Sequence, residues 1–157
     1  MDERKMTRAT LEWLKTRKRE LEDSLRSAGS DADSGHQRAA VHDDQATEQL
    51  KNQRRAELER IGDLRFVVPV EPRTETDSIG IGNRVDLLCL QPKDELSALV
   101  LPADDSTYAE RTGLGMVITP ESPIGKAIIG KAVGEEVEVN TKPPKRIKIR
   151  AIKPGDF

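Results

Sequence analysis

Hydrophobic positions in the first third of the chain recur with helical spacing. Between residues 7 and 28 they lie three, seven and four residues apart, at Leu11, Leu14, Leu21 and Leu25. This is the a/d pattern of a helix that packs against another helix. Thr7 is a suitable N-cap, and Lys18 interrupts the apolar seam at one a position. The spacing predicts a helix from Thr7 to Ala28.

A second helical pattern follows a polar segment. Residues 28–35 combine acids, serines and two glycines, a composition typical of turns. A second helix is predicted from about His36 or Asp44 to Leu64, with a convincing apolar stripe only in its C-terminal half. Two helices with one stripe each, joined by a polar turn, predict an antiparallel coiled-coil hairpin with solvated outer faces.

Beyond residue 66 the pattern changes to short strands. Residues 66–70 predict an apolar exit strand, and residues 71–78 a polar connector. Further strands are predicted at 84–91, 96–101, 116–118, 137–140 and 146–152, with a polar loop at 103–113. Together with one short helix, these strands predict a small α+β domain.

The short helix is predicted within residues 119–131. Ser122 is a favourable N-cap, and Pro123 suits the first helical position because its missing N–H needs no partner there. Gly130 is expected to end the helix. The apolar residues of the helix fall on one face: Ile124, Ala127 and Ile128. Local evidence alone indicates a structural element that packs on a small sheet.

Composition narrows the function classes. Of 157 residues, 34% are charged and 3% are aromatic, and the formal net charge of −2 argues against a generic nucleic-acid coat. Cys89 is the single cysteine, which excludes an intramolecular disulfide. There is no apolar run of membrane-spanning length and no signal-peptide pattern. These features predict a cytoplasmic protein that makes no membrane contact.

Candidate catalytic groups are few. No nucleophile has a plausible base, so no catalytic residue is assigned and the protein is not expected to be an enzyme. Four residues offer the ligands of a mixed metal site: His36, His42, Asp43 and Asp44. Their spacing matches no zinc signature, so a solvated charged face is the preferred interpretation. The last predicted strand has a basic face without aromatic residues, which is a weak nucleic-acid signal.

Acidic residues in and after the predicted turn form another candidate site. Asp31 and Asp33 lie in the turn, and Asp43 and Asp44 follow it. Carboxylates at the end of an arm can complete the coordination of a Mg²⁺ ion held by another macromolecule, because Mg²⁺ keeps several waters and accepts further oxygen ligands. The alternative is a solvated turn that simply favours Asp, Ser and Gly. Both interpretations stay open.

Two segments resemble the Gre family of bacterial transcription elongation factors. Residues 6–15, Met-Thr followed by Trp13 and Leu-Lys, resemble the start of the family's first helix. Residues 121–131, with Gly134-Glu-Glu-Val after them, resemble the family's most recognisable C-terminal stretch. The resemblance covers roughly residues 6–152.

The resemblance implies an N-terminal coiled coil and a C-terminal FKBP-like α+β domain without isomerase activity. We expect an arm at 1–66, a linker at 67–74 and a docking domain at 75–157. The implied partner is core RNA polymerase, with the domain at the rim of its secondary channel and the arm directed towards the active centre. Contact with nascent RNA would be indirect, and a monomer is expected.

The resemblance also assigns site residues. The family's polymerase-docking positions correspond to Glu121, Ser122 and Pro123, and Ile124 is included in the expected docking set. The tip acids would stabilise a Mg²⁺ ion that the polymerase holds. The polymerase then performs the chemistry, and the protein needs no metal or cofactor of its own.

The tip departs from the family pattern. Cleavage-active members of the family carry the tip sequence Gly-Asp-Leu-x-Glu-Asn-Ala-Glu-Tyr, and residues 29–35 replace it here. Asp31 can stand for the Asp of that sequence, but its Glu and Tyr have no counterparts. A helix over residues 7–28 would be about 33 Å long, about three turns shorter than in a cleavage factor. We therefore expect a regulator or inhibitor that does not stimulate transcript cleavage.

Three alternatives remain. One is a cleavage-stimulating elongation factor. The more remote ones are a coiled-coil adaptor and a chaperone or prolyl isomerase. An isomerase needs an aromatic-lined pocket, and the C-terminal domain contains only Tyr108 and Phe157 as aromatic residues.

Overall fold

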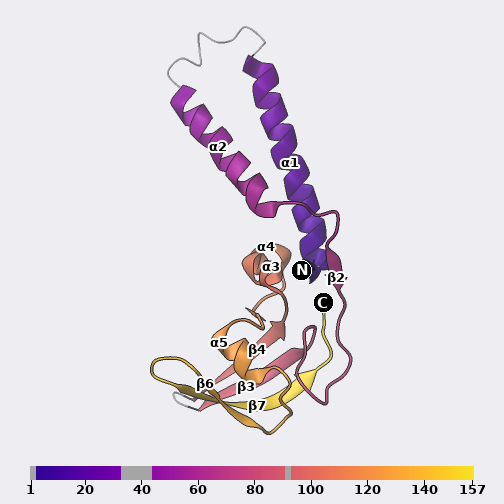
Figure 1. The fold of residues 1–157 in the computed structure, drawn as a ribbon, viewed down its shortest axis with the longest axis vertical. Coiled ribbons are helices and arrows are strands. Elements are labelled where there is room, and N and C mark those ends of the chain that lie inside the picture. Colours follow the sequence, from indigo (N-terminus) through magenta and orange to yellow (C-terminus); the bar gives the residue numbers. More distant parts are fainter. Residues whose placement is uncertain (1–2, 33–43, 91–92) are drawn as a thin grey trace. The chain divides into compact units, whose positions relative to one another are not determined.

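The computed structural model describes residues 3–32, 44–90 and 93–157 (Figure 1). It divides into two compact units: the first consists of Met1–Leu11 and Val67–Phe157, and the second of Glu12–Phe66. The first unit contains a five-stranded sheet with short helices, and the second contains most of the two long helices. The predicted α+β class is confirmed. The residues of α1 up to Leu11, which we expected in the arm, fall in the first unit, and the domain boundaries stay a prediction.

The two long helices are α1 (Arg8–Ala32) and α2 (Asp44–Ile61). As predicted, Thr7 caps α1, because its Oγ1 accepts a hydrogen bond from the Thr10 N–H at 3.3 Å. The predicted end of α1 at residue 28 was wrong by four residues, since a glycine inside a helix costs only about 1 kcal/mol and does not force an end. Of the predicted turn at residues 28–35, residues 28–32 belong to α1, so the turn prediction was wrong for them, and residues 33–35 lie outside the described residues.

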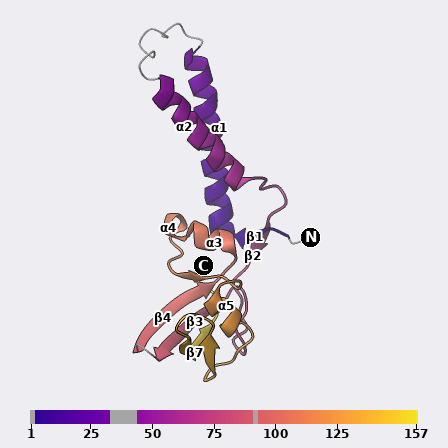
Figure 2. The same ribbon diagram turned by 60° about the vertical axis from the view of Figure 1, so that its left-hand side comes forward.

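Within the second unit, α2 runs back along α1 (Figures 1 and 2). Arg17 Nε and Nη2 donate to the Glu57 carboxylate at 2.8 and 3.1 Å, and this hydrogen bonding raises the pKa of Arg17. Lys18 Nζ donates to the Gly62 carbonyl at 3.0 Å, just beyond the end of α2. Leu11 of the first unit is buried, and so are four residues of the predicted stripes in this unit: Leu14, Leu21, Ile61 and Leu64. Coiled-coil packing of the pair stays a prediction.

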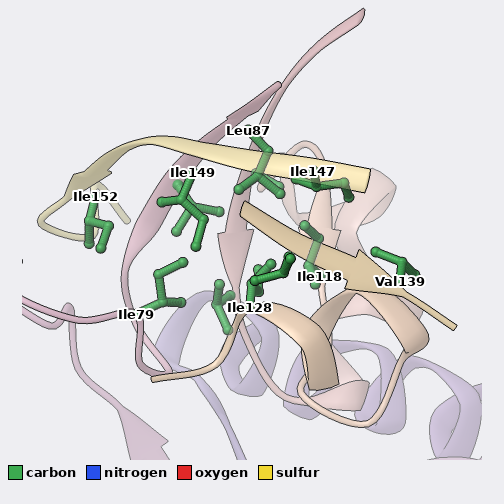
Figure 3. Close-up of a cluster of buried hydrophobic side chains, with 12 residues drawn as sticks. Ile79, Leu87, Ile118, Ile128, Val139, Ile147, Ile149 and Ile152 are labelled. Atoms are coloured by element: carbon green, nitrogen blue, oxygen red, sulfur yellow. The ribbon is translucent and has the colours of Figure 1, made fainter. Parts of the chain in front are cut away.

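The main sheet has the strand order β5-β4-β3-β7-β6. Neighbouring strands are antiparallel except for β4 and β5, which are parallel. The strands lie close to their predicted positions, at β3 (Arg84–Leu90), β4 (Lys93–Val100), β5 (Val117–Ile118), β6 (Glu136–Val139) and β7 (Lys145–Lys153). Apolar residues of the sheet form one core with Ile128 of α5 (Pro123–Ile128), as Figure 3 shows.

The segment predicted as a polar loop contains two short helices, α3 (Ala103–Thr107) and α4 (Ala109–Thr112). The loop prediction was therefore wrong. Acids in the first turn and a glycine after the last residue are ordinary helix boundary signals, and both are present here. The low apolar content of the segment had obscured them.

Within the first unit, Asp105 of α3 connects the N-terminal residues to the part that contains the sheet. Its side chain is fully buried and accepts hydrogen bonds from the Thr7 N–H at 3.1 Å, from Thr7 Oγ1 at 2.6 Å and from Thr10 Oγ1 at 2.6 Å. Arg4 makes a two-pronged ion pair with neighbouring Asp104, at 2.9 and 3.1 Å. Strand β1 (Lys5–Thr7) also pairs in parallel with β2 (Val68–Val70).

We expect Asp105→Ala to lower the free energy of unfolding by roughly 2–4 kcal/mol, because one N–H and two hydroxyls lose their buried acceptor. Urea unfolding followed by circular dichroism measures this loss. Asp104→Ala is the matched control, since it removes a partly exposed ion pair from the same helix and should cost about 1 kcal/mol. Equal losses in the two variants would contradict the assignment of Asp105 as the main anchor.

Candidate functional site

The predicted docking residues are brought together at the start of α5. Ser122 has an extended backbone (φ −69°, ψ 158°), and its Oγ accepts a hydrogen bond from the Gly125 N–H at 3.0 Å. The same hydroxyl donates to the Thr119 carbonyl at 2.7 Å. Pro123 occupies the first turn, where its missing N–H would have had no hydrogen-bond partner within the helix. The predicted capped helix is confirmed, and it ends at Ile128.

Gly125 allows this turn to close tightly. A Cβ atom at this position would lie 1.8 Å from the Thr119 carbonyl oxygen, far inside van der Waals contact. The backbone of α5 therefore packs directly on the chain that leads into it from β5. Only glycine fits without a shift of backbone atoms, so the Ser122–Pro123 corner has one defined position.

The four docking residues differ in exposure. Glu121 and Pro123 are exposed, whereas Ser122 is half-buried and its hydroxyl is engaged in the cap. Ile124 is partly buried and packs against the apolar core below the helix. Glu121 and Pro123 are thus available for contact with a partner, while Ser122 and Ile124 hold them in place.

A shallow groove of about 280 Å³ lies beside these residues. It is lined by Glu121 just before α5, by three residues of α5 and by two residues at the β6 end of the sheet: Pro123, Lys126, Ala127, Glu138 and Asn140. Because β6 is an edge strand, its outer side carries no neighbouring strand in the sheet. Sequence reasoning missed Glu138 and Asn140, which lie 15 and 17 positions after Pro123 and join the site only through the sheet.

The predicted tip acids are only partly described. Asp31 is in the last turn of α1, and Asp44 is the first residue of α2. Asp33 and Asp43 lie outside the described residues, as do His36 and His42. The structure therefore does not test these acids as a site. Among the residues with described side chains, no group of three or more His, Cys, Asp or Glu could hold a metal ion.

None of the described helices combines the length and the apolar character that crossing a membrane requires.

Comparison with known proteins gives a consistent result. Residues 74–154 match the family model described as transcription elongation factor GreA/GreB, C-terminal. The chain is 30% identical over 146 residues to transcription elongation factor GreA of Clostridium acetobutylicum, which covers 91% of this chain and 87% of that protein. It is 35% identical over 106 residues to GreA of Mesoplasma florum, with coverages of 63% and 65%.

Among solved structures, the chain is similar to Gfh1 of Thermus aquaticus. The sequences are 25% identical, the comparison covers 98% of this chain and 99% of that one, and the TM-score is 0.41.

We expect Gly125→Ala to destabilise the protein by about 2 kcal/mol or more, because the added methyl group overlaps the Thr119 carbonyl. The sign is diagnostic, since glycine to alanine inside a helix ordinarily stabilises by about 0.5–1 kcal/mol. Thermal or urea unfolding provides the measurement. Lys126→Ala, at the exposed neighbouring position, should change stability by no more than about 0.5 kcal/mol. A stabilised Gly125→Ala variant would refute the tight turn.

Proposed function

Because the chain belongs to the GreA/GreB family of transcription elongation factors, we propose that it binds bacterial RNA polymerase at the rim of the secondary channel and modulates elongation. The first unit acts as the docking domain, and the α1–α2 pair acts as the arm directed towards the active centre. The protein contributes no catalytic residue, and the polymerase performs any chemistry. In this proposal the protein needs no cofactor of its own, and its tip acids act near the Mg²⁺ ion that the polymerase binds.

The observation that supports docking through α5 is that different residues at its N-terminus are exposed and hold the turn in place. Glu121 offers an exposed carboxylate and Pro123 an exposed, rigid apolar ring. Both stand on a turn fixed by the Ser122 cap and by the close approach of Gly125 to Thr119. A rigid site loses little conformational entropy when a partner binds, which favours affinity. A basic, partly apolar partner surface complements this corner.

The sequence at the tip of the arm supports the hypothesis that this protein is a regulator that does not stimulate transcript cleavage. In residues 29–35 the Glu and Tyr of the cleavage-active pattern have no counterparts. The length of α1 is weaker support than we expected, because its 25 residues span about 38 Å and recover slightly less than one turn of the shortfall. The proposal therefore rests on the chemistry of the tip. A cleavage-stimulating factor is the second candidate, because the relatives that match are named as elongation factors GreA.

We expect Glu121→Arg and Pro123→Ala each to weaken binding to core RNA polymerase by at least about tenfold, corresponding to about 1.4 kcal/mol. Biolayer interferometry with immobilised core enzyme measures the dissociation constants. Glu110→Arg makes the same charge change at an exposed position of α4 and should leave binding unchanged. Affinities unchanged in both α5 variants would place the docking surface elsewhere.

Transcript cleavage in a stalled elongation complex tests the role of the tip. We expect the wild-type protein to bind the complex without accelerating cleavage, because the tip lacks the family's Glu and Tyr. Asp31→Ala/Asp33→Ala should then leave the cleavage rate unchanged. Strong stimulation by the wild type that this double variant abolishes would instead identify a cleavage factor.

A further inference from the structure

A basic cleft of about 480 Å³ lies within the second unit. Its lining consists of four cationic residues, one carboxylate and one leucine: Lys15, Lys18, Arg19, Arg65, Glu22 and Leu64. The volume is in the range of sites that take small molecules rather than macromolecules. An excess of positive charge in a concave surface concentrates anions. The basic cleft thus has the size and the sign of charge for an anionic small molecule.

Three of the cations come from one face of α1. Lys18 and Arg19 follow Lys15 by three and four positions, so both side chains are neighbours of Lys15 on the helix surface. Lys18 Nζ is held by the Gly62 carbonyl at 3.0 Å, which places a fixed ammonium group in the apolar seam of the helix. Lys15 lies 3.9 Å from Glu12, a weak surface pair. The three groups form a cationic surface about one helical turn long.

The remaining cation comes from the segment after α2. Arg65 pairs with the Asp63 carboxylate at 3.0 Å and lowers the pKa of Asp63 to about 2. Asp63 therefore neutralises part of the charge of Arg65. Arg19, by contrast, forms no ion pair with a carboxylate in the described part of the chain. The free positive charge of the basic cleft lies on the α1 side.

An exposed aromatic ring follows the lining residue Arg65 in the chain. Phe66 is 78% exposed, and the Arg65 guanidinium lies 5.5 Å from the centre of its ring. Leaving a phenylalanine this exposed gains nothing from burial, but a flat ring beside a guanidinium is a platform on which a nucleobase can stack. Arg65 therefore both lines the basic cleft and contacts an exposed aromatic face in the same unit.

We propose that the basic cleft binds a nucleoside polyphosphate, with the phosphates on Lys15, Lys18 and Arg19 and the base on Phe66. Several cations within one turn match adjacent phosphates better than a single phosphate. The compact volume favours a free nucleotide over a nucleic-acid strand, which needs a groove that follows its backbone. Lys18 supplies a third cation from the position where it also bonds to the Gly62 carbonyl. This inference is independent of polymerase binding.

Isothermal titration calorimetry of the full chain with GTP at low salt tests the proposal. We expect Lys15→Glu/Arg19→Glu to weaken GTP binding by at least about tenfold, because two phosphate-binding cations become anions. Lys18 is left intact because it bonds to Gly62. Arg26→Glu/Arg55→Glu changes the net charge equally at exposed positions outside the basic cleft and should bind like the wild type. Circular dichroism verifies that both variants fold.

Two further ligands identify what is recognised. Phe66→Ala should weaken GTP binding and leave tripolyphosphate binding unchanged, because only GTP carries a base. A single-stranded oligonucleotide serves as the competing ligand. The proposal is overturned if the wild type does not bind GTP, if both double variants lose binding equally, if GTP binds no better than tripolyphosphate, or if the oligonucleotide binds through these residues and GTP does not.

Discussion

The carboxylate of Asp105 is the interaction on which the organisation of the chain depends. It receives the N–H and hydroxyl of Thr7 and the hydroxyl of Thr10 in a fully buried site, so the start of α1 is fixed to the helix α3. A buried carboxylate is costly unless such donors surround it, which makes the arrangement specific. Together with the β1–β2 pairing, it incorporates residues before Glu12 into the unit that contains the sheet.

At the corner formed by Ser122 and Pro123, hydrogen bonds within a short segment likewise fix the backbone. Its polar groups are satisfied internally, since the Ser122 hydroxyl both accepts from Gly125 and donates to Thr119. Local satisfaction leaves the side chains of Glu121 and Pro123 unneeded for folding and exposed to a partner. Stability and recognition thus depend on different atoms of the same short segment, and substitutions can separate the two.

The second unit carries its charge in two ways. Arg17 and Glu57 pair across α1 and α2 at 2.8 Å, so their charges serve the fold. Lys15 and Arg19, each two positions from Arg17, line a cleft with a single lining carboxylate, where we propose that they bind a ligand. The distinction could not be made from residue type, because it depends on which side chains of the other segments lie opposite each face of α1.

The sequence alone determined the elements whose signals are local. Helix periodicity located both long helices, strand alternation located the sheet strands, and Ser122-Pro123 defined the start of α5, because capping and periodicity act within a few residues. Tertiary structure decided what depends on distant partners. Asp105 stood in a segment that looked like a loop, Glu138 and Asn140 joined α5 only through the sheet, and Lys18 was an anomaly until Gly62 lay opposite it. These separations run from 15 positions, between Pro123 and Glu138, to 98 positions, between Thr7 and Asp105, which is beyond the range of any local pattern.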